Sequence, residues 1–178
     1  MSDSNKSNNA VIIERTFNAP VDMIWQMWTV PEHFKKWYGP KGFTIPVAEM
    51  DLRPGGKRLV CMASPDGSMK MWTAGEHIEI VSNERLSYTE SPADENGNLV
   101  SPSAMGMPDG YPMTTEVNVL LENQDGRTKM VLKHIGMPTD SGAGGGWEQA
   151  FDKLADHVGT VINDSLPYIE SLDSLEVK

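Results

Sequence analysis

The 178-residue chain has little cysteine, few basic residues and no long apolar run, and each shortage excludes something. Its one cysteine, Cys61, cannot form a disulfide within the chain, so no disulfide framework holds the fold. No apolar run reaches the roughly 20 residues that a membrane-spanning helix needs. The first ten residues are polar and lack the apolar core of a secretory signal, so we expect a cytoplasmic protein.

The charge is one-sided, because 25 acidic residues stand against 15 basic ones and give a net charge of −10. Such a field repels phosphate backbones and anionic lipid headgroups, so we expect no nucleic acid and no membrane as partner. His33, His77 and His157 show no metal-ligand spacing with one another or with Cys61. We therefore expect no metal and no cofactor.

The length fits one domain, large enough to bury roughly 70% of the surface of its unfolded chain. Residues 1–9 are polar and predict a disordered lead-in. A single domain is expected over residues 10–166. Pro167 follows the last amphipathic stretch, so residues 167–178 are predicted to be a tail.

Apolar and polar residues alternate from Val11 to Phe17, which predicts a strand. Arg15 is the one charge on the more apolar face of that strand. We expect it to pair with a carboxylate such as Glu76, and the alternative is that it binds a carboxylate of the ligand. Two short helices should follow. The first has helical spacing from Val21 to Trp28, and the second opens at a capping box formed by Thr29 and Glu32.

From about residue 43 to residue 136, turn sequences separate short runs that predict six antiparallel strands. Pro46 places the first of them at an edge of the sheet. Residues 91–112 are aperiodic and predict a long loop insertion, either disordered or a lid over a site. A long amphipathic helix is predicted from Gly146 to about Leu166.

A glycine-rich run, residues 141–146, precedes this helix and raises the possibility of a phosphate site. The run ends in Trp147 and Glu148 instead of the Lys-Ser/Thr that a phosphate loop requires, and it does not match the dinucleotide pattern. We interpret the glycines as a turn with positive φ that carries Trp147 and Phe151 onto the sheet.

The predicted architecture is α+β, with the helices on one side of a twisted antiparallel sheet. The segments "FNAPVDMIWQMWTVPEHFKKWYGP", "LRPGGK" and "GWEQAFDKLADHV" resemble the SRPBCC (START-like) superfamily, and within it the family of homologues of the activator of the heat-shock-protein-ninety ATPase. The resemblance spans about residues 10–165. It implies a helix-grip fold, in which a curved seven-stranded sheet holds the long C-terminal helix around a hydrophobic cavity.

We expect this cavity to bind a small hydrophobic molecule. The alternatives are a chaperone-associated or stress-response interaction module and a lyase, cyclase or hydrolase, for which no catalytic residue can be assembled from the sequence. A monomer or weak homodimer is expected. His134 lies on the inward face of its strand. It is expected to be either a structural histidine with satisfied hydrogen bonds or the leading polar contact, with His134 or Arg15 orienting the polar end of the ligand. The expected ligand-binding residues are Arg15, Trp25, Phe34, Trp37, Met62, Trp72, Tyr88, Met130, His134, Trp147, Phe151, Leu154 and Val158.

Overall fold

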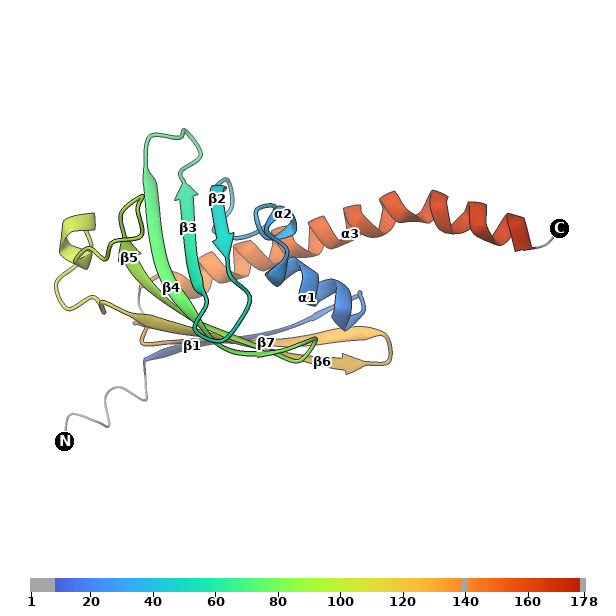
Figure 1. Cartoon of the computed structure of the whole chain (residues 1–178), viewed down its shortest axis with the longest axis horizontal. Coiled ribbons are helices and arrows are strands. Elements are labelled where there is room, and N and C mark those ends of the chain that lie inside the picture. The colour runs from blue at the N-terminus through green and yellow to red at the C-terminus, as the bar shows by residue number, and fades with distance from the viewer. Residues whose placement is uncertain (1–8, 139–140, 177–178) are drawn as a thin grey trace.

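The computed structural model describes residues 9–138 and 141–176, so the predicted disordered lead-in falls outside the described residues except for Asn9. Figure 1 shows one curved sheet with a long helix running along its concave side and beyond it. In chain order the elements are β1 (Ala10–Phe17), α1 (Val21–Thr29), α2 (Pro31–Phe34), β2 (Thr44–Met50), β3 (Lys57–Ala63), β4 (Lys70–Val81), β5 (Arg85–Ala93), the 3₁₀ helix η1 (Pro102–Met105), β6 (Thr115–Gln124), β7 (Arg127–Ile135) and α3 (Ala143–Glu176).

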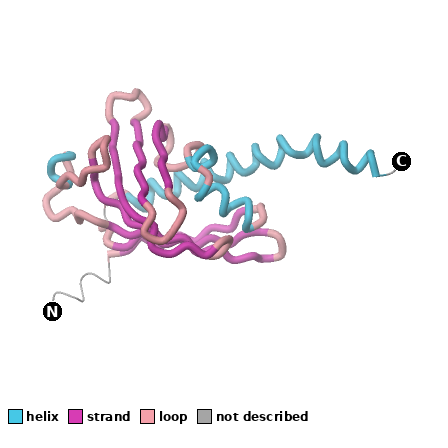
Figure 2. Tube along the Cα trace, in the orientation of Figure 1, coloured by secondary structure: helices cyan, strands magenta, loops and turns pink. Residues whose placement is uncertain are grey.

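The sheet has seven strands in the order β1-β7-β6-β5-β4-β3-β2, and every neighbouring pair is antiparallel. The helix-grip architecture predicted from the sequence is confirmed, and β2, which carries Pro46, is an edge strand as expected. The helices α1, α2 and α3 lie on the same side of the sheet (Figure 2). Strand order and curvature therefore leave one concave face for them to cover.

Three local predictions were wrong. The strand β5 extends to Ala93, so the loop between β5 and β6 covers residues 94–114 instead of beginning at residue 91. The predicted capping box is absent: the residue before α2 is Val30, and the Thr29 hydroxyl donates to the Trp25 carbonyl oxygen at 2.8 Å. A threonine near a helix C-terminus can bond back to the preceding turn, which removes it from capping the next helix.

The third error concerns the end of the C-terminal helix. The helix α3 continues through Pro167 to Glu176, where a tail was predicted. A proline removes one backbone hydrogen bond, and here neither glycine nor a second proline follows it to end the helix. The distal part of α3 projects past the sheet in Figure 1.

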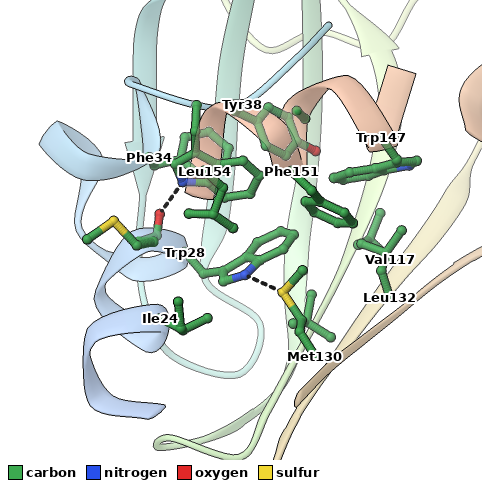
Figure 3. Close-up of a cluster of buried hydrophobic side chains, with 14 of the residues drawn as sticks. Ile24, Trp28, Phe34, Tyr38, Val117, Met130, Leu132, Trp147, Phe151 and Leu154 are labelled. Carbon is green, nitrogen blue, oxygen red and sulfur yellow. Dashed lines mark hydrogen bonds between the residues drawn. The ribbon is translucent and has the colours of Figure 1, made fainter. Parts of the chain in front are cut away.

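Much of the space between the sheet and the helices is filled by aromatic side chains (Figure 3). Trp28 of α1 is completely buried, and its ring centroid lies 4.7 Å from that of Trp37 and 6.4 Å from that of Phe151. Its Nε1 lies 3.3 Å from the sulfur of Met130 on β7. We call this part of the concave face, centred on Trp28, Trp37, Phe151 and Leu154, the filled end.

Candidate ligand-binding pocket

At the other end of the concave face, near the start of α3, the packing leaves a pocket of ≈ 260 Å³. The loop after α2, the strands β3 to β7, the loop 94–114 and the first two turns of α3 form its walls. Pockets that hold small molecules usually measure about 300–1,000 Å³, so this one suits a compact ligand. We call this region the pocket end.

Methionine is the most frequent residue type in the pocket walls. Five of the chain's twelve methionines line the pocket. The thioether side chain is flexible and polarisable, so walls of this kind adapt to ligands of differing shape. These methionines are Met62 on β3, Met71 on β4, Met105 and Met107 in the loop, and Met137 after β7.

Small residues on one face of α3 make room for the pocket. Ala143, Gly146 and Ala150 recur at helical spacing and line it beside Trp147. The expected positive-φ turn is found at Gly142, with a φ of +82°, whereas the glycines after Ala143 already lie within the helix. The turn prediction was therefore wrong for Gly144–Gly146, and at Gly146 the absence of a side chain leaves space in the pocket wall.

The loop between β5 and β6 forms one wall of the pocket through η1 and the residues after it. Met105, Met107, Tyr111 and Pro112 line the cavity, and the Tyr111 hydroxyl donates to the sulfur of Met137 at 3.1 Å. The loop thus contacts the segment between β7 and α3. Its opening as a lid stays a prediction.

His134 lies in the pocket wall, 3% exposed, with both ring nitrogens hydrogen-bonded. The indole Nε1–H of Trp147 donates to its Nδ1 at 3.1 Å, so Nδ1 carries no proton. In the neutral ring the proton is then on Nε2, which donates to Thr115 Oγ1 at 2.9 Å. Burial lowers the pKa of His134, with a smaller opposing effect of Glu90, and keeps this neutral tautomer near pH 7.

The second polar group of the pocket is the carboxylate of Glu90, held by a chain of hydrogen bonds. The Tyr38 hydroxyl donates to Glu90 Oε1 at 2.5 Å and, having one proton, accepts from the Tyr88 hydroxyl at 2.9 Å. Burial, with a further effect of Glu90, raises the pKa of both tyrosines, so they remain protonated donors. The guanidinium of Arg58 lies over the Tyr88 ring, 3.6 Å from its centre, in a cation–π contact.

Three of the thirteen predicted ligand-binding residues line the pocket: Met62, His134 and Trp147. His134 was expected either to be structural or to contact the ligand directly, and both of its ring nitrogens already have hydrogen-bond partners within the protein. Of the groups in this chain of bonds, the Thr115 hydroxyl is the one that still has a proton to donate. The other ten do not line the pocket; most of them belong to the buried core or pack against it. They are Arg15, Trp25, Phe34, Trp37, Trp72, Tyr88, Met130, Phe151, Leu154 and Val158.

Arg15 points to the concave side as predicted, but its expected partner was wrong. Its Nη2 lies 3.1 Å from Glu148 Oε2 and 2.9 Å from Asp152 Oδ1, both on α3. Glu76 instead pairs with Lys57. The two ion pairs of Arg15 join β1 to α3. Arg15 does not line the pocket.

Sequence reasoning missed Glu90 and Thr115, although a signal for both exists. Leu86, Tyr88 and Glu90 alternate on β5, so a charged residue continues a face whose other members are buried. Thr115 begins the buried alternation of β6 and lies opposite Glu90 in the register of the two strands. The same reasoning that singled out Arg15 applies to Glu90.

Within the described residues, no group of three or more His, Cys, Asp or Glu side chains could hold a metal ion. His33 and His157 do meet, with His33 Nδ1 at 3.0 Å from His157 Nε2, but no third ligand joins them there. Likewise, none of the helices over the described residues is both long and apolar enough to cross a membrane.

The curved seven-stranded sheet around a long C-terminal helix, with a pocket between them, defines a helix-grip protein of the START-like class. The family described as "Activator of Hsp90 ATPase homolog 1-like protein" matches residues 18–159, and the chain belongs to this family. The curated proteins contain no match to the chain.

Solved structures of similar fold come from several bacteria. A protein from Nitrosomonas europaea is 22% identical with a TM-score of 0.71, over 87% of this chain and 97% of its own. A protein from Chromobacterium violaceum is 23% identical with a TM-score of 0.70, over 84% and 96%. An AHSA1-like protein from Aeromonas hydrophila is 20% identical with a TM-score of 0.64, over 85% and 93%. At these identities the likeness shows the fold.

Proposed function

We propose that the protein binds a small, mostly apolar molecule in the pocket end of the concave face. The observation that carries this proposal is the cavity of ≈ 260 Å³ with five methionines in its walls, next to a filled end of tightly packed rings. An apolar cavity of about 150 Å³ accommodates benzene, so this larger pocket has room for an apolar molecule bigger than benzene. That the protein acts in the cytoplasm is an expectation from the sequence alone.

The hydrogen bonds of the pocket support binding over acid–base chemistry at His134. A general base needs a free lone pair within reach of its substrate, and the lone pair of His134 Nδ1 is occupied by the Trp147 indole. The hydrogen-bonded His134 therefore serves to shape and polarise the pocket wall.

The second candidate function is the stimulation of a chaperone ATPase, which the description of the family favours. It predicts faster ATP hydrolysis by a purified chaperone when the protein is added. Filling the pocket should leave that stimulation unchanged if a protein-binding surface is responsible, so the two functions can be separated in one set of variants.

The pocket is tested by titrating the full chain with N-phenylnaphthylamine, a neutral apolar dye that fluoresces when it leaves water. We expect saturable binding. Ala143→Leu adds a branched side chain at the pocket wall and should weaken binding at least tenfold. Ala155→Leu makes the same change on an exposed position of α3 and is the matched control. No binding by the unaltered protein, or equal binding by Ala143→Leu, would contradict the proposed function.

A further inference from the structure

The polar groups in the walls are few, and their charges identify the kind of ligand end that fits. Among the described residues that line the pocket, Glu90 has the one carboxyl group, and neither a lysine nor an arginine lines the pocket. Methionines, prolines and aromatic rings make up most of the remaining surface. A carboxylate in such surroundings is costly unless a donor or a cation partners it.

The protein satisfies only half of this carboxylate. Tyr38 donates to Oε1, whereas Oε2 has no hydrogen-bond partner and Glu90 has no ion pair within residues 9–138 and 141–164, whose side chains are described. The buried Arg58 forms no ion pair with Glu90, and its guanidinium lies over the Tyr88 ring, 3.6 Å from the ring centre. The free oxygen is therefore open to a donor that enters the pocket.

Thr115 adds a second group at the same corner. It faces Glu90 across the β5–β6 pair, and both residues line the pocket. Its oxygen accepts one hydrogen bond from His134 and keeps one lone pair, so it can accept a second. A ligand group with two or more N–H donors can bond to both oxygens, whereas a ligand carboxylate would lie against Glu90.

We propose that the ligand is a compact apolar amine, whose protonated nitrogen donates to Glu90 Oε2 and Thr115 Oγ1 while its apolar body lies among the methionines. This inference rests on the proposed function and names the ligand class for the same pocket. The net charge of −10 acts in the same direction, because it raises the local concentration of cations and repels anions.

The test is calorimetric titration of the full chain near pH 7 with three probes that share one ring: phenylethylamine, phenylethanol and phenylacetate. We expect the amine to bind most tightly, the alcohol less tightly and the carboxylate at least tenfold more weakly than the amine. Carboxylate binding as tight as amine binding would overturn the inference without any variant.

Glu90→Gln removes the charge and keeps an oxygen that can accept from Tyr38. It should weaken phenylethylamine about tenfold or more and leave phenylethanol within about threefold, because a charge-assisted hydrogen bond is roughly twice as strong as a neutral one. Glu122→Gln removes the same charge from an exposed position of β6 and controls for net charge. An unchanged ratio of amine to alcohol affinity in Glu90→Gln would contradict the role of Glu90.

The two proposals fail differently. If N-phenylnaphthylamine and phenylethanol bind and the amine has no advantage, the ligand class is wrong and the apolar pocket stands. If neither the dye nor any of the three probes binds, both proposals are refuted.

Discussion

The two ends of the concave face are built from the same sheet and the same helix, yet one is solid and the other hollow. At the filled end Trp28 of α1 and Trp37, after α2, pack against Phe151 of α3. These two rings and Phe34 of α2 have no exposed surface. At the pocket end a loop takes the place of these helices, and α3 presents alanine and glycine. The covering segments and the residues that α3 presents, and not the sheet, therefore decide which end is hollow.

The two ends also differ in polar groups. At the filled end Trp37 Nε1–H donates to the Met27 carbonyl oxygen at 2.9 Å, and this bond joins the turn after α2 to α1. At the pocket end Trp147, His134 and Thr115 bond in series and end at a hydroxyl that faces the cavity. Indole donors thus hold the core together at one end and form part of the pocket wall at the other.

The largest effect we expect is at the centre of the filled end. Trp28→Ala should lower the free energy of unfolding by about 3–5 kcal/mol, because a fully buried ring leaves a cavity that its neighbours cannot fill. Met107→Ala, at the half-buried rim of the pocket, should cost less than about 1 kcal/mol. Chemical denaturation measures the free energy of unfolding of both variants. Equal decreases in the two variants would contradict the difference in packing between the two ends.

A smaller effect is expected where the pocket wall is held by a hydrogen bond. Trp147→Phe removes the donor to His134 Nδ1 and should cost about 1–3 kcal/mol, because a buried acceptor is left without a partner. Trp25→Phe, at a half-buried indole of α1, is the control and should cost less. A larger loss in the control would show that the bond to His134 does not stabilise the wall.

The next expected effect is a dependence on pH. Burial lowers the pKa of His134, and of His77 and His157, below the ordinary value of 6.5. As the pH falls through 6.5, the histidines of the unfolded chain therefore take up protons before those of the folded protein. The free energy of unfolding should decrease through this range, and these histidines should not change it above about pH 7.5. Urea denaturation between about pH 7.5 and about pH 5 measures this.

His134→Gln separates the pocket histidine from the other two. Glutamine offers an oxygen for Trp147 and an N–H for Thr115, and it does not titrate in this range. The variant should lose less stability on acidification than the unaltered protein. An identical pH profile would place the whole effect at His77 and His157, outside the pocket.

The smallest effect concerns Arg15 on β1 and its ion pairs with α3. Arg15→Gln breaks two ion pairs with α3, but both carboxylates are largely exposed, so the loss in the free energy of unfolding should stay below about 1 kcal/mol. The dye should bind as before, since Arg15 does not line the pocket. A tenfold loss of dye affinity would mean that the pocket extends to Arg15.

Periodicity and turn chemistry were sufficient to predict the sheet, the edge position of β2 and the face of α3 that packs inward. They could not locate the pocket, because inward residues of a core and of a cavity have the same spacing. Phe151 and Trp147 illustrate this, since both lie on the same face of α3 and only Trp147 lines the pocket. Whether an inward residue of α3 lines the pocket depends on the segment that packs opposite it. That packing joins segments that lie far apart in the sequence.

Two further features depended on three-dimensional contacts. The lack of periodicity around Met105 and Met107 indicated a long loop and not a tight hairpin turn. That this loop forms a pocket wall could be seen only from its contact with Met137 through Tyr111. The partner of Arg15 could not be predicted either, because several carboxylates on different elements could reach an inward arginine.

The methionines allow the central claim to be tested within one molecule. Met62, Met71, Met105, Met107 and Met137 line the pocket, whereas Met27 and Met130 are buried at the filled end. In methyl NMR spectra of methionine-labelled protein, titration with N-phenylnaphthylamine should shift the five pocket methyl signals and leave those of Met27 and Met130 in place. Shifts spread equally over both groups, or confined to Met27 and Met130, would contradict the account.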